Sequence, residues 1–285
     1  MTSTPKATPL ISRDNFDLVT TYCIIDDFFK IFDDNDKSKV GRRASLSISD
    51  IATITLIGCV YECGCLKSLY KLLFNKFSLD FKLPRYQNFV NTMNKYSVYL
   101  LKFIVTVCKF NNKKSGIITF CDSTKIEVCK IYREYRHRTM KLLATKSKST
   151  TGWFYGMRLH VLCDQYGNLM QIKFTTATVG ERKVLDDFLG KLNNCIVVAD
   201  GGYVSSLLSQ KTKRDSNNTL ITAVRKNMKT LHTIWQSRCL NLRSRIESVF
   251  GELKERYNLV TSLPRSINGY LAYYIRSIFG YMVLS

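Results

Sequence analysis

Acidic residues and histidines are scarce in this sequence. Its 285 residues include 22 Asp and Glu against 43 Lys and Arg, a formal net charge of +21, and only three histidines. The histidines, His137, His160 and His232, are scattered, so neither a histidine-centred hydrolase nor a histidine metal site is indicated. The excess of positive charge is larger than solubility requires and favours a polyanionic partner, either a nucleic acid or an anionic membrane surface.

Long apolar runs are also absent. No stretch reaches the roughly 18 uninterrupted apolar residues that a membrane-spanning helix needs. The most apolar tail, residues 269–279, has Arg276 in its middle, and residues 1–6 lack the apolar core of a signal peptide. We therefore expect a cytoplasmic protein with no membrane association, whose partner is a nucleic acid.

Cofactor motifs are missing as well. In a cytoplasmic protein the ten cysteines are expected to be reduced, mostly buried small hydrophobic residues. Cys59, Cys63 and Cys65 form the only tight cluster, but a structural zinc site usually needs a second ligand pair, and no suitable Cys or His pair follows. The phosphate-binding pattern GxxxxGK[ST] does not occur, which argues against a nucleotide cofactor.

Helical periodicity dominates the first third of the chain. Residues 1–12 are predicted to form a loose arm. The first helix is predicted to begin at Asp14, and the second follows a Ser- and Asp-rich cap and ends near Tyr61. Further helices are predicted over residues 66–77, from Pro84 onward, and over residues 97–110. Short helices with tight breaks fit a helix-turn-helix unit. Its polar third helix would present Arg85, Gln87 and Asn88 to DNA. A plain helical bundle with a polar surface explains the same pattern.

The periodicity changes after residues 111–116. We expect two domains, an all-α N-terminal domain over residues 1–112 and a second domain over residues 113–285. Short strands are predicted in the second domain over residues 117–121, 153–163, 168–174, 195–199 and 220–224, with Asp164 as a turn residue between the second and third. Three consecutive strands followed by alternating helices and strands predict an α/β fold with a five-stranded sheet.

A strongly basic segment separates the first two predicted strands. Between Lys130 and Lys148, a single acid, Glu134, stands among seven basic residues. The basic side chains that we expect to contact DNA are Arg133, Arg136, Arg138 and Lys141. Tyr132 and Tyr135 are interleaved with them, and such a mixture suits phosphate contact together with stacking on an unpaired base. A solvated loop is the alternative.

Three acids follow or occupy elements of the second domain. Asp122 ends the first predicted strand, Asp200 ends the fourth, and Glu247 lies on an amphipathic helix over residues 240–254. A carboxylate at the end of a buried strand needs a partner or a cation. The carboxyl ends of neighbouring parallel strands form a crevice where three such groups can converge. Oxygen ligands of this kind suit Mg²⁺, and a pair of such ions suits phosphoryl transfer.

The late helix has an apolar stripe with a charged row beside it. The stripe consists of Leu242, Ile246, Val249, Phe250 and Leu253, and the row consists of Arg243, Glu247, Gly251 and Lys254. Taken alone, this row suits a surface helix with an ordinary ion pair between Arg243 and Glu247. Glu252 and Glu255 are alternative third acids, but both lie off the row.

Four segments, in order and spacing, resemble a known family. They are Cys121-Asp122-Ser123-Thr124, Gly152-Trp153-Phe154-Tyr155-Gly156-Met157-Arg158-Leu159-His160, Ala199-Asp200-Gly201-Gly202-Tyr203 and Arg243-x3-Glu247-x6-Lys254. The chain resembles bacterial insertion-sequence transposases with an Asp-Asp-Glu active site, of the nine-eight-two group. The resemblance is strong over residues 117–254 and weaker over residues 46–50. The 47 positions from Asp200 to Glu247 fit it.

The resemblance implies a ribonuclease H-like fold in which Asp122, Asp200 and Glu247 bind two Mg²⁺ ions, with Mn²⁺ as a possible substitute. It implies that Arg243 and Lys254 contact phosphates at the element end. Leu240 stands where many relatives have a tyrosine, so that tyrosine's role does not transfer.

The implied activity is metal-dependent DNA strand cleavage and strand transfer. The implied partners are the element's terminal inverted repeats and target DNA, bound by a homo-oligomer in the bacterial cytoplasm at the nucleoid. Two other functions remain open. One is a transposase-derived DNA-binding protein without activity. The other is a ribonuclease H-type nuclease, which the helical N-terminal region and the basic segment disfavour.

Overall fold

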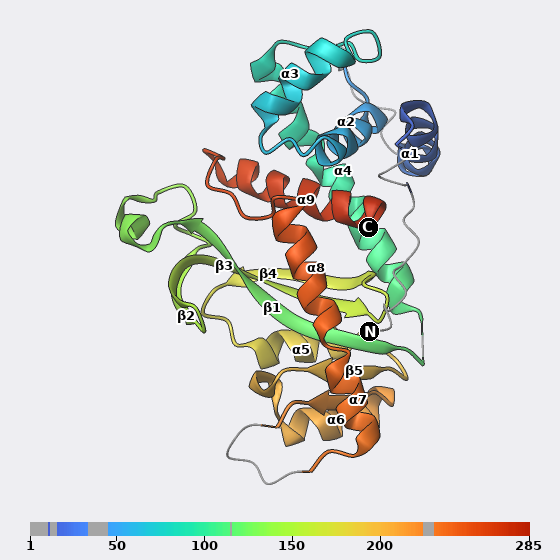
Figure 1. Cartoon of the computed structure of the whole chain (residues 1–285), viewed down its shortest axis with the longest axis vertical. Helices are drawn as coiled ribbons and strands as arrows, with labels where there is room; N and C mark the ends of the chain where they lie inside the picture. The colour runs from blue at the N-terminus through green and yellow to red at the C-terminus, as the bar shows by residue number, and fades with distance from the viewer. Residues whose placement is uncertain (1–10, 12–15, 34–44, 115, 225–230) are drawn as a thin grey trace. The chain divides into compact units, whose positions relative to one another are not determined.

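The computed structural model describes residues 11, 16–33, 45–114, 116–224 and 231–285, so the expected arm of residues 1–12 lies almost wholly outside the described part. The chain, drawn in Figure 1, divides into two compact units. The sheet unit comprises Val105–Lys254 and Val260–Ser262, and the helical unit comprises Thr8–Ile104, Glu255–Leu259 and Leu263–Ser285. Among the described helices, none combines the length and apolar character needed to span a membrane.

Five described helices contribute to the helical unit. They are α1 (Leu18–Asp33), α2 (Ile48–Val60), α3 (Leu66–Lys76), α4 (Tyr86–Asn112) as far as Ile104, and α9 (Ile267–Leu284). A capping box starts α2, as its Ser- and Asp-rich beginning predicts. The Ser47 hydroxyl accepts from the backbone N–H of Asp50 at 3.0 Å, and the Asp50 carboxylate accepts from the N–H of Ser47 at 2.7 Å.

Two features of this unit differ from the expectation. Separate helices are predicted from Pro84 and over residues 97–110, but α4 runs unbroken for 27 residues. Its polar positions interrupt the apolar periodicity without breaking the helix, because they include neither Pro nor Gly. α9 is buried around most of its circumference and groups with the helical unit, whereas a boundary at residue 112 places it in the second domain.

The cysteines are free thiols, and one of them caps a helix. All ten are free, and five of them are buried. The Cys65 sulfur accepts from the backbone N–H of Ser68 at 3.4 Å and so caps α3. Cys59, Cys63 and Cys65 belong to no group of three potential metal ligands among the described residues.

One mixed sheet forms the centre of the sheet unit. Its strands are β1 (Ile118–Cys129), β2 (Thr145–Ser149), β3 (Gly152–Asp164), β4 (Leu169–Thr176), β5 (Ile196–Ala199) and β6 (Thr219–Thr222). β3 is antiparallel to β1, β2 and β4, whereas β5 is parallel to both β1 and β6. The order across the sheet is β2-β3-β1-β5-β6, and β4 also pairs with β3, along residues 157–163.

The described residues form six strands of this sheet, so the prediction of five is wrong. β2 was missed because its exposed Lys146 and Lys148 alternate with half-buried polar residues, which leaves no apolar side to detect. β1 is also longer than residues 117–121. It continues because Ile126 and Val128 are buried at alternate positions after Asp122. Asp122 therefore lies within a strand and not at its end.

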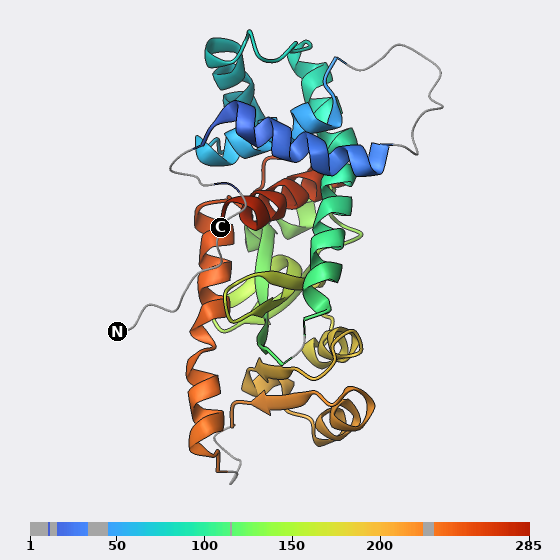
Figure 2. The same cartoon turned by 90° about the vertical axis from the view of Figure 1, so that its right-hand side faces the viewer.

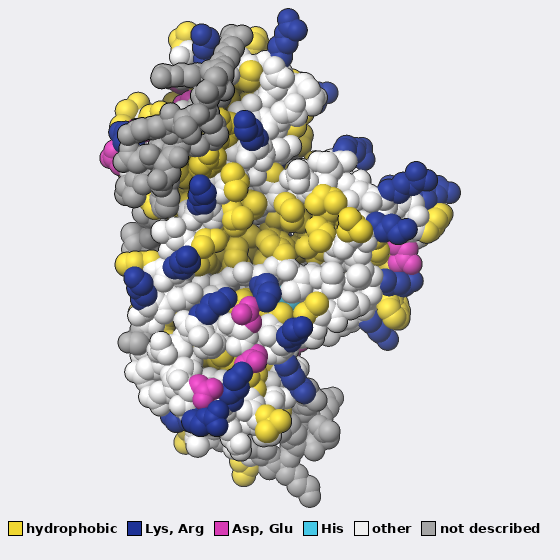
Figure 3. All heavy atoms as spheres, turned by 180° about the vertical axis from the view of Figure 1, so that it is seen from behind, with side chains coloured by type: hydrophobic (Ala, Val, Ile, Leu, Met, Phe, Trp, Pro, Cys, Tyr) yellow, Lys and Arg dark blue, Asp and Glu magenta, His cyan; other side chains and the backbone are white. Residues whose placement is uncertain are grey.

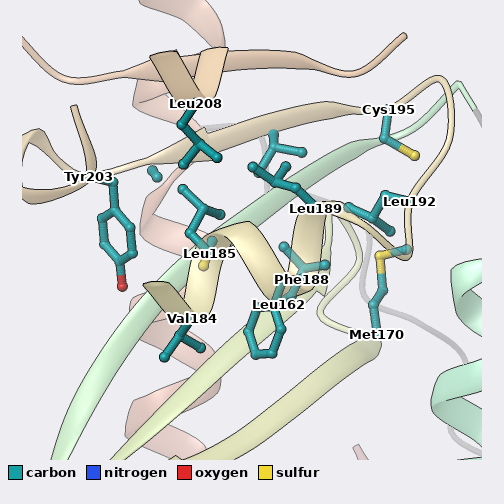
Figure 4. Packing of buried hydrophobic residues seen from close by; sticks show 13 residues of the cluster. Leu162, Met170, Val184, Leu185, Phe188, Leu189, Leu192, Cys195, Tyr203 and Leu208 are labelled. Carbon is teal, nitrogen blue, oxygen red and sulfur yellow. The ribbon is translucent and has the colours of Figure 1, made fainter. Parts of the chain in front are cut away.

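Helices cover both faces of this sheet. α5 (Glu181–Leu189) and α6 (Ser206–Ser216) lie on one face, and α7 (Ile234–Asn241) and α8 (Ser244–Glu255) lie on the other (Figure 2). Successive side chains of a strand point to opposite faces. Cys121 belongs to a core cluster on the α5 side of the sheet. Leu185 and Phe188 of α5 belong to the same cluster (Figure 4). Phe120 instead lines a cavity of about 340 Å³ with Ser244 at the start of α8.

Two local features of β3 follow directly from the sequence. A Cβ at Gly156 would collide with the backbone carbonyl of Ile126 on the neighbouring strand, so glycine permits the close approach of β1 and β3. The prediction that Asp164 is a turn residue is confirmed. Its carboxylate accepts from the backbone N–H groups of Tyr166 and Asn168, each at 2.9 Å.

Candidate active site

Asp122 and Asp200 lie at the same level of two neighbouring strands. β1 and β5 are parallel, and Cys121 of one pairs with Ala199 of the other. Asp122 and Asp200 are the next residues along each strand, so their backbones lie roughly 4.8 Å apart. The structure thus brings these two predicted site residues together at the carboxyl end of β5.

Helix α8 carries Glu247 toward the carboxyl end of β5. Asp122 shares the orientation of Phe120, two residues earlier, and therefore faces the helix layer that includes α8. Glu247 lies in the first turn of α8. The buried side chains that dock this helix are Ile246, Val249, Phe250 and Leu253, which confirms four members of the predicted apolar stripe.

The prediction that Leu242 is the fifth member of the stripe is wrong. The sequence predicts one helix over residues 240–254, but α7 ends at Asn241, and residues 242–243 form a turn before α8. Leu242 caps the end of α7 and is 38% exposed, so it does not belong to the buried face of α8. The turn also takes Arg243 off the regular helix.

Arg243 connects the acids. One guanidinium nitrogen, Nη1, lies 3.2 Å from Oδ1 of Asp200, and the other, Nη2, lies 3.4 Å from Oε1 of Glu247. The Arg243 side chain is only 24% exposed, whereas that of Glu247 is 62% exposed. The positive charge of Arg243 also lowers the pKa of Asp122. Arg243 therefore acts on three carboxylates and not only on the helical neighbour that a surface ion pair would involve.

The surroundings of Asp122 shift its pKa strongly. Burial raises its pKa from 3.8 to about 6. The backbone N–H of Ser123, at 2.7 Å, and the charge of Arg243 lower the pKa, while the charges of Glu181 and Asp200 raise it. A half-buried carboxylate beside other carboxylates is stabilised by any cation that approaches it.

The chemistry of the donor set suits a hard divalent cation, because three carboxylates come from two strands and a helix. Within the described ranges, no three His, Cys, Asp or Glu side chains lie close enough together to hold one ion. Arg243 supplies the positive charge between the acids in this arrangement. If all three acids are to bind metal, Arg243 has to withdraw from Asp200 and Glu247.

A second polar network, missed by the sequence reasoning, lies on the opposite face of β1. The Ser123 hydroxyl donates to Oε1 of Glu181 at 2.7 Å, and Nη1 of Arg158 lies 2.7 Å from the same oxygen. Glu181 approaches from α5, so it is not equivalent to Glu247. One signal could have revealed this network: a charged Arg158 within the apolar run of residues 153–163 requires a partner.

Lys254 lies two helical turns beyond Glu247 and is half-buried. Burial lowers its pKa, and the charge of Lys125 lowers it further, while Glu127 raises it. A half-buried lysine near a second cation favours an anionic ligand. The predicted phosphate contact of Lys254 stays a prediction.

The basic segment between β1 and β2 is exposed. Arg133 and Arg136 lie on the short 3-10 helix η1 (Ile131–Arg136), and their guanidinium groups lie 5.6 and 5.3 Å from the ring centres of Tyr132 and Tyr135. Arg138 and Lys141 are exposed in the following turns. Lys and Arg side chains are also more frequent than Asp and Glu on the face drawn in Figure 3. Exposure agrees with both DNA contact and a solvated loop.

The residues predicted to read DNA bases lie around the beginning of α4. Arg85, Gln87 and Asn88 are all exposed. The Gln87 amide donates to Oδ1 of Asn91 at 3.4 Å. Residues 61–65 connect α2 to α3, and residues 77–85 connect α3 to α4. The helix-turn-helix assignment stays a prediction.

Comparisons with known proteins identify the family. No curated protein matches the sequence significantly. The chain is similar to the Mos1 transposase paired-end complex with left transposon end, at 11% identity, 89% coverage of this chain, 83% coverage of that chain and a TM-score of 0.26. It is also similar to the Mos1 mariner paired end complex with Mn, at 13% identity, 93% coverage of this chain, 87% coverage of that chain and a TM-score of 0.27. Residues 112–267, more than half of the sequence and including Asp122, Asp200 and Glu247, match the transposase DDE domain, and the chain therefore belongs to this family.

Proposed function

We propose that the chain is the transposase of a bacterial insertion sequence of the nine-eight-two group, which cleaves DNA at the element ends and joins them to target DNA. The observation that carries this proposal is the register of β1 and β5, which sets Asp122 beside Asp200 under the helix that carries Glu247. An antiparallel sheet portion followed by two parallel strands also supports a ribonuclease H-like assignment.

The three acids have one role in this proposal: Asp122, Asp200 and Glu247 hold two divalent ions, Mg²⁺ or in its place Mn²⁺. Such ions, when bound, activate the attacking oxygen and stabilise the leaving one. Asp122 is suited to this role because burial disfavours its charge and a cation restores it. Arg243 neutralises Asp200 and Glu247 in the arrangement described above, and together with Lys254 it would bind phosphates of the element end.

DNA binding is divided between the two parts of the chain. Residues 1–112 would bind the terminal repeats through Arg85, Gln87 and Asn88, and residues 113–285 would carry the chemistry. The exposed Arg133, Arg136, Arg138 and Lys141 would contact the DNA backbone near the site. We expect the chain to act at the nucleoid as a homo-oligomer on DNA, as its resemblance implies.

A strand-cleavage and strand-transfer assay tests the proposal. The substrate is duplex DNA with the sequence that flanks the reading frame, incubated with Mg²⁺ or Mn²⁺. Glu247→Gln should abolish both reactions and preserve DNA binding. Glu255→Gln, the same change on the same helix, is the matched control and should remain active. Lys254→Ala should instead weaken binding of the DNA end.

Three results would contradict the proposal. Equal activity of wild type, Asp122→Asn and Glu247→Gln would exclude the assigned acids. Salt-dependent DNA binding without nicking under any metal condition would indicate a DNA-binding protein without activity. Preference for an RNA–DNA hybrid over duplex DNA would indicate a ribonuclease H-type nuclease.

A further inference from the structure

Arg276 is a buried cation that forms no ion pair within the described part of the chain. It lies in the middle of α9 and is 8% exposed. Its Nη1 donates to the backbone carbonyl of Met93 at 3.4 Å and to the side-chain oxygen of Asn94 at 3.3 Å, and both acceptors are neutral. Among the described carboxylates, none forms an ion pair with it.

Such an arrangement is costly in the free protein. Burial of a charge carries a large desolvation penalty. Two neutral acceptors at long hydrogen-bond distances and the Tyr273 ring, whose centre lies 6.0 Å from the guanidinium carbon, offset it only in part. Burial lowers the pKa of Arg276 to about 10, so the side chain still carries its charge at neutral pH. An anion brought to this position from outside would be bound with unusual advantage, because the arginine is already desolvated and oriented.

Arg276 is not sealed off, because it lines a cleft of about 530 Å³ within the helical unit. Lys67 of α3 and Arg265, just before α9, lie on the same cleft and are exposed. Amide groups of α4 complete the polar lining, namely those of Gln87, Asn91 and Asn94. None of the described residues around the cleft is acidic.

Three helices also begin at this cleft. Cys65 and Leu66 at the start of α3, Tyr86 at the start of α4 and Ser266 at the cap of α9 all line it. The N-terminus of a helix carries a partial positive charge of about half a unit and presents backbone N–H groups to a ligand. The helix ends therefore add to the same positive potential as Arg276, Lys67 and Arg265.

The size and lining of the cleft distinguish between phosphate ligands. A volume of about 530 Å³ falls in the range of roughly 300–1,000 Å³ typical of sites for whole ligands. It is therefore larger than a lone phosphate ion needs. Gln and Asn amides are groups that hydrogen-bond base edges, and those of Gln87 and Asn91 lie beside the cations. These features fit a nucleotide within a strand.

We propose that this cleft binds the phosphate backbone of DNA, with Arg276 as its buried anchor and Lys67 and Arg265 at its rim. The proposal rests on the proposed transposase function, and it adds a defined DNA site that includes the C-terminal helix α9. DNA binding by the helical unit would then require α9 as well as the helices before residue 112.

The salt dependence of DNA binding tests the rim residues. Binding of the full chain to duplex DNA is measured at several salt concentrations. Lys67→Gln and Arg265→Gln should each reduce the slope of log affinity against log salt by about 0.9. Lys76→Gln is the control. It removes the same charge from the same helix, about 13.5 Å further along the axis, and should leave the slope unchanged. Unchanged slopes in both rim variants would overturn the proposal.

Arg276→Gln separates binding from folding. Because the substitution removes a buried unpaired charge, the thermal midpoint of the free protein should not fall, whereas DNA affinity should fall about tenfold or more. A lower midpoint with unchanged DNA affinity would mean that Arg276 is only structural. Arg276→Lys, which keeps the charge, should recover part of the affinity. If neither Arg276→Gln nor Arg276→Lys changes the affinity for DNA, the assignment of Arg276 as the anchor is overturned.

Competition distinguishes the sources of phosphate. A single-stranded oligonucleotide should compete with the labelled duplex at far lower concentration than inorganic phosphate. Competition by inorganic phosphate alone would overturn the DNA assignment. If wild type binds and cleaves element ends while all cleft variants bind DNA normally, only this inference fails. If wild type shows neither binding nor cleavage, the proposed function fails first.

Discussion

Replacement of Asp122 by Asn should stabilise the metal-free protein at neutral pH. Burial within β1 raises the pKa of this carboxyl from 3.8 to about 6, so the folded protein holds the proton more tightly than the unfolded chain does. The stabilisation from that proton is fully present below a pH of about 3.8 and is lost as the pH rises through about 6. Above that range the ionised Asp122 destabilises the fold.

The size of the effect follows from the two pKa values. Their separation corresponds to about 3 kcal/mol at 25 °C, because each pKa unit is worth roughly 1.4 kcal/mol. The favourable charge of Arg243 is already included in the folded value. Asn has nearly the same shape, can accept the N–H of Ser123 and does not ionise. The stability of Asp122→Asn relative to wild type should therefore rise by about 2.4 kcal/mol between pH 4 and pH 8, because the rest of the difference appears below pH 4.

Tryptophan fluorescence during urea unfolding measures this difference. Both tryptophans, Trp153 and Trp235, lie in the sheet unit, so the signal reports on the unit that contains Asp122. The series runs from pH 4 to pH 8 with a chelator present. Asp186→Asn is the matched control, because the Asp186 side chain is 45% exposed and its ion pair with Lys211, at 2.8 Å, is of little expected value. A constant difference across this pH range, or a less stable Asp122→Asn protein at pH 8, would refute the reasoning.

Further predictions concern the metal, the close approach of two strands and the second network. Mg²⁺ at ten times its dissociation constant should stabilise wild type by about 1.4 kcal/mol and Asp122→Asn by much less. Thermal unfolding followed by fluorescence measures both, and equal increases in the thermal midpoint would contradict the metal assignment. Gly156→Ala should lower the thermal midpoint because its Cβ meets a backbone carbonyl, whereas Gly251→Ala, with open space and a helical position, should raise stability by up to about 1 kcal/mol. Glu181→Gln should destabilise the fold by about 1–3 kcal/mol by leaving Arg158 without its charged partner, and it should also shift the acidic limb of the pH–activity profile downward, since the Glu181 charge raises the pKa of Asp122. An unshifted profile would mean that Glu181 does not influence the acid.

The strands that could be predicted are those with buried faces. Residues 153–163 and 195–199 form apolar runs, and both became strands because their side chains fill the sheet core. β2 has no such run, and pairing with β3 alone makes it a strand. A hydrophobic pattern detects burial, so it does not detect an exposed edge strand that is held by backbone hydrogen bonds.

A sequence pattern shows whether a side chain is buried more readily than it shows which part of the chain that side chain contacts. The apolar tail around Arg276 predicts a buried helix, but nothing in its periodicity says which unit α9 packs with. The ion pair of Arg158 and Glu181 depends on the position of α5 over β1, and the two residues stand 23 positions apart. The convergence of Asp122 and Asp200 was more accessible, because two parallel strands that each end an apolar run with an acid are in register.

The break between α7 and α8 changes the interpretation of the charged row. An arginine on a regular helix would pair with Glu247 one turn later, and that pair would contribute only a few tenths of a kcal/mol. In the turn before α8, Arg243 reaches Asp200 as well, and its half-buried guanidinium faces less competition from water. The same group therefore opposes the mutual repulsion of the acids when no metal neutralises them. Under the proposed function, metal binding would remove the need for this contact and leave Arg243 available to a DNA phosphate, so metal and DNA binding should reinforce each other at this edge of the sheet.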